Sequence, residues 1–327
     1  MQRIPPVLLY GGVAISNIGE KMRTLYKYTT YRNLDFLRDP TLRISIPKQL
    51  NDPFESHISE NFMSYILNIH SSTNMKDFLW AVPIVTNRKI EEFGIVSFSE
   101  TSRNSLMWAH YADEHNGLCI GMDDDVLSSL NENNSSPEYS ALFPIKVDYD
   151  SLRFDSLEKG VGVIQTIFKL LTRKSDEWIY EKEHRAIVPL EWCDEIKIKD
   201  INTMEVQYTL NAINHIYGAL NPTGTTIKNN LIETKDGKYY TFNHEAIRVV
   251  MENKNFIFIK HISPSKIKSI HLGCRFPEKI KDEIVEQISS PDHPLNHIDL
   301  YKYKLIDNNR FEMSEFQIYS KSEGIIT

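Results

Sequence analysis

The segment from Trp178 to Arg185, WIYEKEHR, places acidic and basic side chains between aromatic ones. In a strand, successive side chains point to opposite faces, so Glu181, Glu183 and Arg185 are expected on one face. The apolar run AIVPL follows, which predicts a strand that starts exposed and ends buried. Two carboxylates beside a guanidinium can shift pKa values and stabilise positive charge. The segment is therefore a candidate catalytic face, with an exposed row of salt bridges as the alternative.

A second polar segment, NDPFE, runs from Asn51 to Glu55. Asn and Asp side chains bond to their own backbone in turns, so a purely structural turn is one interpretation. Asp52 and Glu55 also flank the aromatic Phe54, which is a layout that suits a ligand pocket. Both interpretations stay open from the sequence alone.

A third segment, LMWAHYADEH, is expected to be a helix that starts at Asn104 or Ser105 and stops at Gly117. Helical spacing puts Trp108 and Tyr111 on one stripe and His110 off it. Such a stripe belongs to a core more often than to a stacking platform. His110 is a candidate polar contact.

Composition restricts the class of protein. The chain has 327 residues, is 41% hydrophobic and carries a net charge of −7, so it is globular and a poor non-specific binder of nucleic acid. Its three cysteines (Cys119, Cys193 and Cys274) lie far apart without a CxxC pair, which favours a reduced, cytoplasmic setting. The early apolar run VLLYGGVAI is too short to cross a membrane.

Several familiar motifs are missing from the sequence. There is no GxGxxG after a strand, no GxxxxGK[ST] and no HExxH. A Rossmann cofactor site, a P-loop and a zincin are therefore not supported. Without paired His or Cys ligands, no bound metal is expected.

The pattern of elements predicts an α+β fold with a mixed, mainly antiparallel sheet and flanking helices. Strands are expected at 24–30, 42–47, 94–100, 117–122, 256–263 and 267–273, and a long amphipathic helix over 151–174. Asp236-Gly237 predicts the turn of a hairpin. The expected organisation is an N-terminal arm or added strand (1–20), one α+β domain (21–290) and a C-terminal β extension (291–327).

Taken in order, the segments LYKY, ISIPKQLNDPFE, VSFSE, LMWAHYADEHNGLCIGM, VDY, WIYEKEHR and IKSIHLG resemble a widespread bacterial family known only as a domain of unknown function. The resemblance covers about residues 24–275. Leu50 stands where that family usually has Phe, and His184 where it usually has Trp. Neither departure touches the polar residues.

The layout of these segments also looks similar to ADP-ribosyltransferase-type folds. That likeness implies NAD as substrate and an ADP-ribosyltransferase, or an NAD glycohydrolase, of a bacterial toxin or phage-defence type. It implies that Glu183 stabilises the ribosyl cation, that Glu181 serves the acceptor and that Arg185 supports them, each partly accessible in a cleft. The acceptor would be a protein or a nucleic acid, and an antitoxin or defence-system partner is conceivable.

The same likeness implies a set of substrate-binding residues. One of Tyr26, Lys27 and Tyr28 would take the early-strand role, and Ser45 or Ser99 the second-strand role. Phe54 or Trp108 could stack on nicotinamide or adenine. The remaining substrate-binding candidates are Asn51, Asp52, Glu55, His110, Tyr111 and Trp178.

Two other functions remain open from the sequence. In a metal-dependent nuclease, the carboxylates of Asp52, Glu55, Glu181 and Glu183 would gather magnesium ions, with Lys182 beside a phosphate. The order Glu-Lys-Glu differs, however, from the Glu-x-Lys of a restriction-type core. In a non-catalytic sensor, the aromatic segments would bind a nucleotide or a partner protein.

Overall fold

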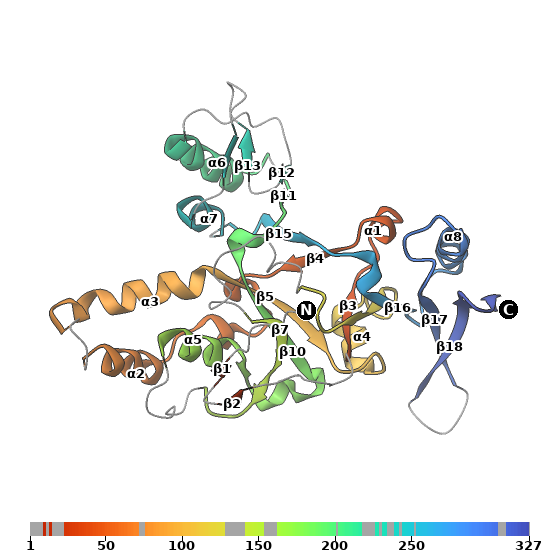
Figure 1. The fold of residues 1–327 in the computed structure, drawn as a ribbon, viewed down its shortest axis with the longest axis horizontal. Helices are drawn as coiled ribbons and strands as arrows, with labels where there is room; N and C mark the ends of the chain where they lie inside the picture. The colour runs from red at the N-terminus through yellow and green to blue at the C-terminus, as the bar shows by residue number, and fades with distance from the viewer. Residues whose placement is uncertain are drawn as a thin grey trace, which may run out of the picture.

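The computed structural model of the protein describes residues 9–10, 13–14, 23–71, 76–127, 141–153, 162–200, 202–217, 226–228, 231–233, 239–241, 244–251, 253–306 and 312–326. These residues form a nine-stranded sheet, a four-stranded sheet and three two-stranded pairs. Helices flank the sheets (Figure 1).

The nine-stranded sheet carries the site. In spatial order its strands are β19 (Gly324–Ile325), β18 (Met313–Ser320), β17 (Asp299–Leu305), β16 (Ile267–Leu272), β6 (Leu118–Asp123), β3 (Thr24–Thr29), β5 (Phe93–Ser99), β10 (Glu183–Pro189) and β7 (Ala141–Lys146). Every neighbouring pair is antiparallel except β16 and β17. The predicted α+β class with a mainly antiparallel sheet is confirmed.

The four-stranded sheet lies above the large one in Figure 1. Its order is β12 (Thr226–Lys228), β11 (Glu195–Ile198), β15 (Phe256–His261) and β4 (Thr41–Ile44). The helices are α1 (Asp35–Arg38), α2 (Glu60–Ser71), α3 (Val82–Glu91), α4 (Ser105–Tyr111), α5 (Val163–Leu171), α6 (Met204–Tyr217), α7 (His244–Met251) and α8 (Glu278–Ser289). A single bridge, Ser45 with Ile95, connects the chain after β4 to β5.

Alternation along β5 separates two apolar cores. Val96 and Phe98 belong to the core shared with the four-stranded sheet and α6 to α8. Phe93 and Ile95 belong to a second core, which α2, α3 and α5 complete. Side chains two apart share a face, so Ser97 follows on the face of the second core. A polar region therefore begins where that second core ends.

The segment 178–185 is not one strand, which corrects the sequence prediction. Asp176–Glu181 is a 3-10 helix, η6, whose first turn is capped by the Ser175 side chain accepting from the backbone N–H of Glu177. Lys182 then takes a left-handed φ of 46°, and β10 starts only at Glu183. The capping serine and the turn override the alternating pattern.

Helix α4 begins as predicted and ends early. The side chain of Asn104 accepts from the backbone N–H groups of Leu106 and Met107, which confirms the predicted start. The helix ends at Tyr111, before three consecutive residues with positive φ, Asp113–His115, rather than at Gly117. The predicted helix over 151–174 is also shorter, because α5 ends at Leu171 and a two-residue strand, β9 (Arg173–Lys174), follows.

The ends of the chain and the predicted hairpin are described in part. Strands β1 (Leu9–Tyr10) and β2 (Val13–Ala14) pair with each other, and the rest of 1–20 lies outside the described residues. Strands β13 (Leu231–Glu233) and β14 (Tyr239–Thr241) form the predicted hairpin pair, although the Asp236-Gly237 turn is outside the described residues. Strands β17 to β19 extend the large sheet beyond β16.

We expect Gly273→Ala to destabilise the fold, because a Cβ there would lie 2.0 Å from the backbone carbonyl oxygen of His115. Backbone cannot swing away, so the free energy of unfolding should fall by about 1–3 kcal/mol. Gly162→Ala is the matched control, since its Cβ would meet only the flexible Gln165 side chain. Urea unfolding of both variants measures the difference, and equal stabilities would contradict the close approach of Gly273 to the backbone of His115.

Candidate functional site

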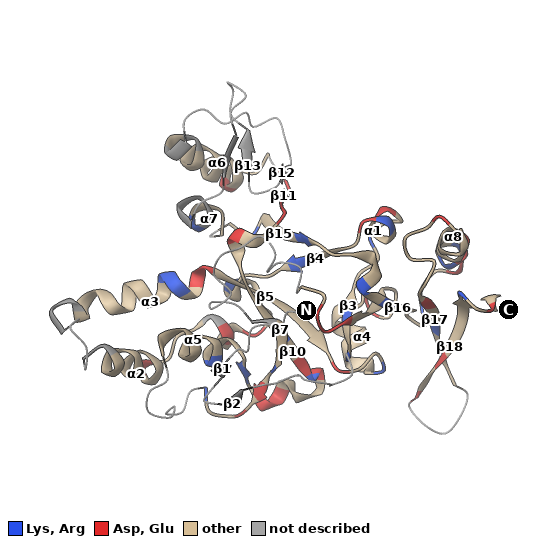
Figure 2. Ribbon diagram, viewed as in Figure 1, with Lys and Arg blue, Asp and Glu red and all other residues tan. Residues whose placement is uncertain are grey.

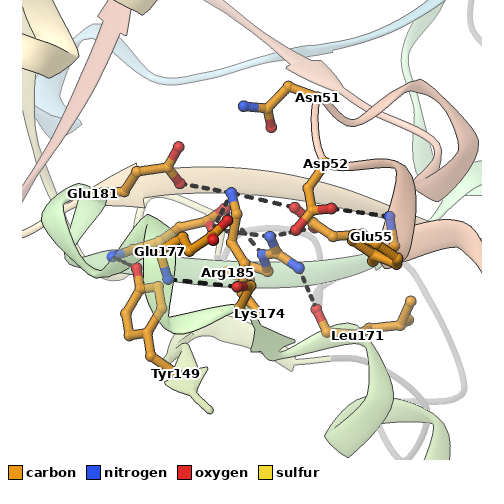
Figure 3. Close-up of polar contacts among 12 residues, drawn as sticks. Asn51, Asp52, Glu55, Tyr149, Leu171, Lys174, Glu177, Glu181 and Arg185 are labelled. Carbon is orange, nitrogen blue, oxygen red and sulfur yellow. Dashed lines mark hydrogen bonds and ion pairs between the residues drawn. The ribbon is translucent and has the colours of Figure 1, made fainter. Parts of the chain in front are cut away.

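Arg185 is the centre of the candidate site. It is 1% exposed and lies on β10. Its Nε and Nη2 donate to the two carboxylate oxygens of Glu183 at 2.9 and 2.8 Å, and its Nη1 donates to the carbonyl of Leu171 at 2.7 Å. Nη2 also forms an ion pair with Glu55 (Figure 3). A buried guanidinium is thus bound on every side.

Lys174 joins the remaining carboxylates to this centre. Its Nζ lies 2.7 Å from Glu181, 3.2 Å from Glu55 and 3.6 Å from Glu183. It also lies 4.6 Å from the centre of the Trp178 ring. We call Glu55, Lys174, Glu181, Glu183 and Arg185 the buried ion cluster, because every member is buried.

Short local structures bring these residues together. Glu55 lies on the 3-10 helix η2 (Pro53–Ser56), where Asp52 caps the first turn by accepting from the N–H of Phe54 at 2.9 Å. Lys174 lies on β9, directly after α5. Glu181 ends η6, and the left-handed Lys182 then lets Glu183 begin β10. The turn, rather than one strand face, directs both glutamates to Lys174.

A chain of hydrogen bonds connects the cluster to the surface. The exposed Asn51 donates to the hydroxyl of Tyr111 at 2.5 Å, and this hydroxyl donates to Glu181 at 2.5 Å. Ser99 donates to the backbone carbonyl of Glu181 at 2.7 Å, and the hydroxyl of Tyr149 accepts from the backbone N–H of Glu183 at 2.8 Å. The three polar segments found in the sequence therefore converge.

Glu183 and Glu55 both bind Arg185, yet their pKa values shift in opposite directions. Burial alone would raise the pKa of Glu183, but Arg185 and Lys174 outweigh it and lower this pKa to about 2. Burial raises the pKa of Glu55 despite the same two cations. One carboxylate is thus held ionised, while the other is shifted towards its protonated form.

The pKa values of Lys174 and Lys27 shift in opposite directions. Burial would lower the pKa of Lys174, but Glu183, Glu55 and Glu181 raise it overall. Lys27, whose Nζ donates to the carbonyl of Ser97 at 2.7 Å, has its pKa lowered by burial to about 8. Lys174 therefore stays charged, whereas Lys27 lies closer to its neutral form.

A pocket of about 230 Å³ opens against the cluster. It is lined by Asp52, Phe54, Glu55, Asp150, Ser151, Arg153, Leu170, Arg173, Lys174 and Ser175. Phe54 is 61% exposed and Arg153 lies 5.7 Å from its ring centre. The wall of the pocket thus contains part of the buried ion cluster, an exposed aromatic ring and further charged side chains.

Several predicted residues lie away from the pocket. Trp108 is fully buried between Tyr28 and Tyr303, so it cannot stack on a ligand, and Tyr28 is itself buried. Tyr26 contacts His271 in the part of the sheet beyond β3. The exposed His110 contacts only the edge of the site, through the rings of Tyr111 and Tyr180.

The two serine candidates, Ser99 and Ser45, are placed differently relative to β5. Ser99 lies on β5 between β3 and β10, opposite both Tyr26 and Glu183 in the register. Ser45 bridges Ile95, four residues earlier along β5. The predicted accessible positions of Glu181 and Glu183 are wrong, because each is only 4% exposed.

The most important residue that sequence reasoning missed is Lys174. Its only signal is RK directly after the apolar run IFKLLT, where a surface position is the ordinary expectation. Arg153, Arg173 and Tyr149 were missed as well. A lysine buried by partners far along the chain leaves no local pattern.

Comparison with known proteins gives a match to one family model over part of the chain, and that model names no activity. Residues 107–186 match the model of a family described as "Protein of unknown function (DUF2971)". The resemblance to an uncharacterised domain family is thereby confirmed over this stretch, which includes Tyr111, Lys174 and the whole WIYEKEHR segment. No curated protein and no solved structure matches the chain.

The described residues offer neither a metal centre nor a membrane-spanning helix. They contain no group of three or more His, Cys, Asp or Glu side chains placed to hold a metal ion. Within the same residues, no helix is both long and apolar enough to cross a membrane. Figure 2 shows basic and acidic residues interspersed along the described ribbon.

We expect the free energy of unfolding of Glu183→Gln to depend less on pH in the acid range than that of the wild type. Folding favours ionised Glu183, so its contribution is complete above the ordinary pKa of 4.5 and is lost as the pH falls through about 2. This difference corresponds to about 3 kcal/mol at most. The free energy of unfolding, measured by urea titration from pH 7 to pH 2, should therefore fall less in the variant than in the wild type.

The exposed Glu177, outside the cluster, provides the control variant Glu177→Gln. Its curve should follow the wild type throughout. Parallel wild-type and Glu183→Gln curves would show that the buried pair does not control acid stability.

Proposed function

We propose that this protein cleaves the bond between nicotinamide and ribose in NAD and passes ADP-ribose to an acceptor or to water. The pocket beside the buried ion cluster is the place of reaction. Bond cleavage builds positive charge on the ribose, as in glycoside hydrolysis. Fixed carboxylates beside that charge lower the barrier by preorganised electrostatic stabilisation.

The observation that carries this proposal is a pair of buried carboxylates in the pocket wall. Asp52 and Glu55 are both buried and both line the pocket. The second oxygen of Asp52, Oδ2, is buried without a hydrogen-bond partner among the described residues. A buried carboxylate oxygen without a partner is costly unless a cation meets it. A developing ribosyl cation is such a partner.

The burial of Glu183 changes its proposed role. It is bound at both oxygens by Arg185 and does not line the pocket, so it acts as the anchor of the cluster rather than as the group facing the sugar. Asp52 and Glu55 do line the pocket. Glu55, with its raised pKa, is suited to take the proton of the incoming nucleophile.

The other walls of the pocket suit parts of a dinucleotide. Phe54 offers an exposed ring for stacking, and Arg153 beside it offers charge to a phosphate. About 230 Å³ is less than the roughly 300–1,000 Å³ of sites that enclose a drug-sized ligand. Only the nicotinamide and its ribose would enter, while the remainder lies across the rim.

The acceptor side is assigned to the hydrogen-bonded chain of Asn51, Tyr111 and Glu181. This chain runs from an exposed amide to a buried carboxylate over two contacts of 2.5 Å. It offers an incoming nucleophile a polar approach from the surface. A protein, a nucleic acid or water could occupy that position, and a toxin or phage-defence role would follow from a macromolecular acceptor.

We expect Glu55→Gln to reduce nicotinamide release from NAD about a hundredfold or more, because it removes the proposed general base from the pocket. Gln has the same shape, and matched melting curves should show a folded protein. The assay follows nicotinamide by chromatography. Glu177→Gln, which alters an exposed carboxylate outside the pocket, should retain wild-type turnover. Wild-type turnover by folded Glu55→Gln would exclude this mechanism.

We expect NAD turnover to survive EDTA. Lys174 and Arg185 already occupy the centre of the carboxylates, where a nuclease of this type would hold magnesium. Activity should be measured on NAD and, separately, on single- and double-stranded nucleic acid, with EDTA and after adding magnesium. Loss in chelator with recovery in magnesium would favour the nuclease instead.

A further inference from the structure

Three side chains on β16 and β18, two strands that β17 separates, form a second polar site away from the buried ion cluster. Ser269 and His271 lie on β16 and Glu315 lies on β18, on the right of Figure 1. The hydroxyl of Ser269 lies 2.8 Å from Nε2 of His271. Nδ1 of the same ring lies 2.5 Å from Oε1 of Glu315. None of the three lines the pocket described above.

The chemistry of these groups fixes where the protons are. A carboxylate only accepts, so Nδ1 of His271 carries a proton towards Glu315. In the neutral ring, Nε2 is then the acceptor for the hydroxyl of Ser269. Burial would raise the pKa of Glu315, but hydrogen bonds from His271 and Tyr303 lower it. An ionised acid therefore orients a histidine that accepts from a serine, which is how a serine nucleophile is activated.

Gly121 makes room for the serine side chain. Gly121 pairs with Ser269 on one side and with Tyr26 on the other. A Cβ on Gly121 would lie 2.4 Å from the Ser269 hydroxyl and 3.3 Å from the Tyr26 ring, so a larger residue here would displace that hydroxyl. Burial raises the pKa of Tyr26, which keeps its own hydroxyl a donor.

Ser269 and His271 are buried, and partly exposed side chains surround them. The side chain of Glu315 is 30% exposed, and Tyr26 and Tyr301 are half-buried. The ring of Tyr301 stacks on His271 at 4.9 Å. The register of β16 with β6 also shifts between Ile267 and Ser269, a type of irregularity that re-aims side chains beside active sites.

We propose that Ser269 is a nucleophile towards short acyl esters, with His271 as its base and Glu315 as the residue that positions the histidine. The serine oxygen bonds to the ester carbonyl carbon while its proton passes to Nε2. The bond to the leaving alkoxide then breaks, and the alkoxide takes that proton. Water repeats these steps on the acyl-serine and releases the acid. Tyr26 is placed to donate to the oxyanion. This activity is independent of NAD cleavage.

The test uses a fluorophosphonate probe on the purified full chain. The Ser269 oxygen would attack phosphorus, fluoride would leave, and His271 would take the proton. We expect covalent labelling that peptide mass spectrometry assigns to Ser269, and its absence in Ser269→Ala. His271→Gln should slow labelling about a hundredfold or more, because it removes a general base. Release of nitrophenol from a nitrophenyl acetate ester should follow the same order.

Ser263→Ala is the matched control, because this exposed serine meets only the hydroxyl of Ser265. It should label and turn over ester like the wild type. Melting curves separate loss of fold from loss of chemistry, and mapping the label on the wild type requires no variant at all. An unlabelled wild-type Ser269, or equal labelling rates in folded His271→Gln, would overturn the proposal and leave Ser269 as a buried partner of the histidine.

Discussion

The burial of Arg185 is the constraint on which the site depends. A guanidinium taken out of water must be matched by charge and by hydrogen-bond acceptors, or the fold loses several kcal/mol. Here Glu183 and Glu55 supply the charge, and the Leu171 carbonyl supplies a further acceptor. These partners come from β10, η2 and the end of α5, so one side chain fixes three separate segments of the chain.

That constraint also explains why the sheet face is divided. The core around Phe93 and Ile187 ends where the cations begin, and the aromatic cluster around Trp108 starts on the far side. Ion pairs alone would account for a rigid interior. The unpartnered oxygen of Asp52 is what a purely structural network would avoid, since a buried polar atom without a partner costs the fold free energy. Asp52 lines the pocket.

Sequence reasoning identified Arg185 and the carboxylates of the site but missed Lys174. Glu55, Glu181 and Glu183 stand in conspicuous short motifs beside aromatics, so residue type and spacing sufficed to find them. Lys174 follows an apolar helix, and only the long-range approach of η2 and η6 makes it central. The predicted strand position of Glu181 was wrong for a local reason. Ser175 caps a 3-10 helix that ends at Glu181, and an alternating pattern of side chains cannot reveal such a helix. Burial of Trp108, favoured by its helical stripe, is confirmed.

The two polar sites share one sheet yet have opposite designs. In the buried ion cluster, Arg185 and Lys174 each contact several carboxylates at once. The chemistry proposed for this site falls to Glu55, the carboxylate of the cluster that lines the pocket, and to its neighbour Asp52. At the second site the polar groups instead form one chain of hydrogen bonds, from Ser269 to His271 and from His271 to Glu315. The aromatic cluster around Trp108 packs against Tyr111 near the first site and against Tyr26 near the second. Because an apolar core has a low dielectric constant, this cluster strengthens the electrostatics of the charged groups beside it.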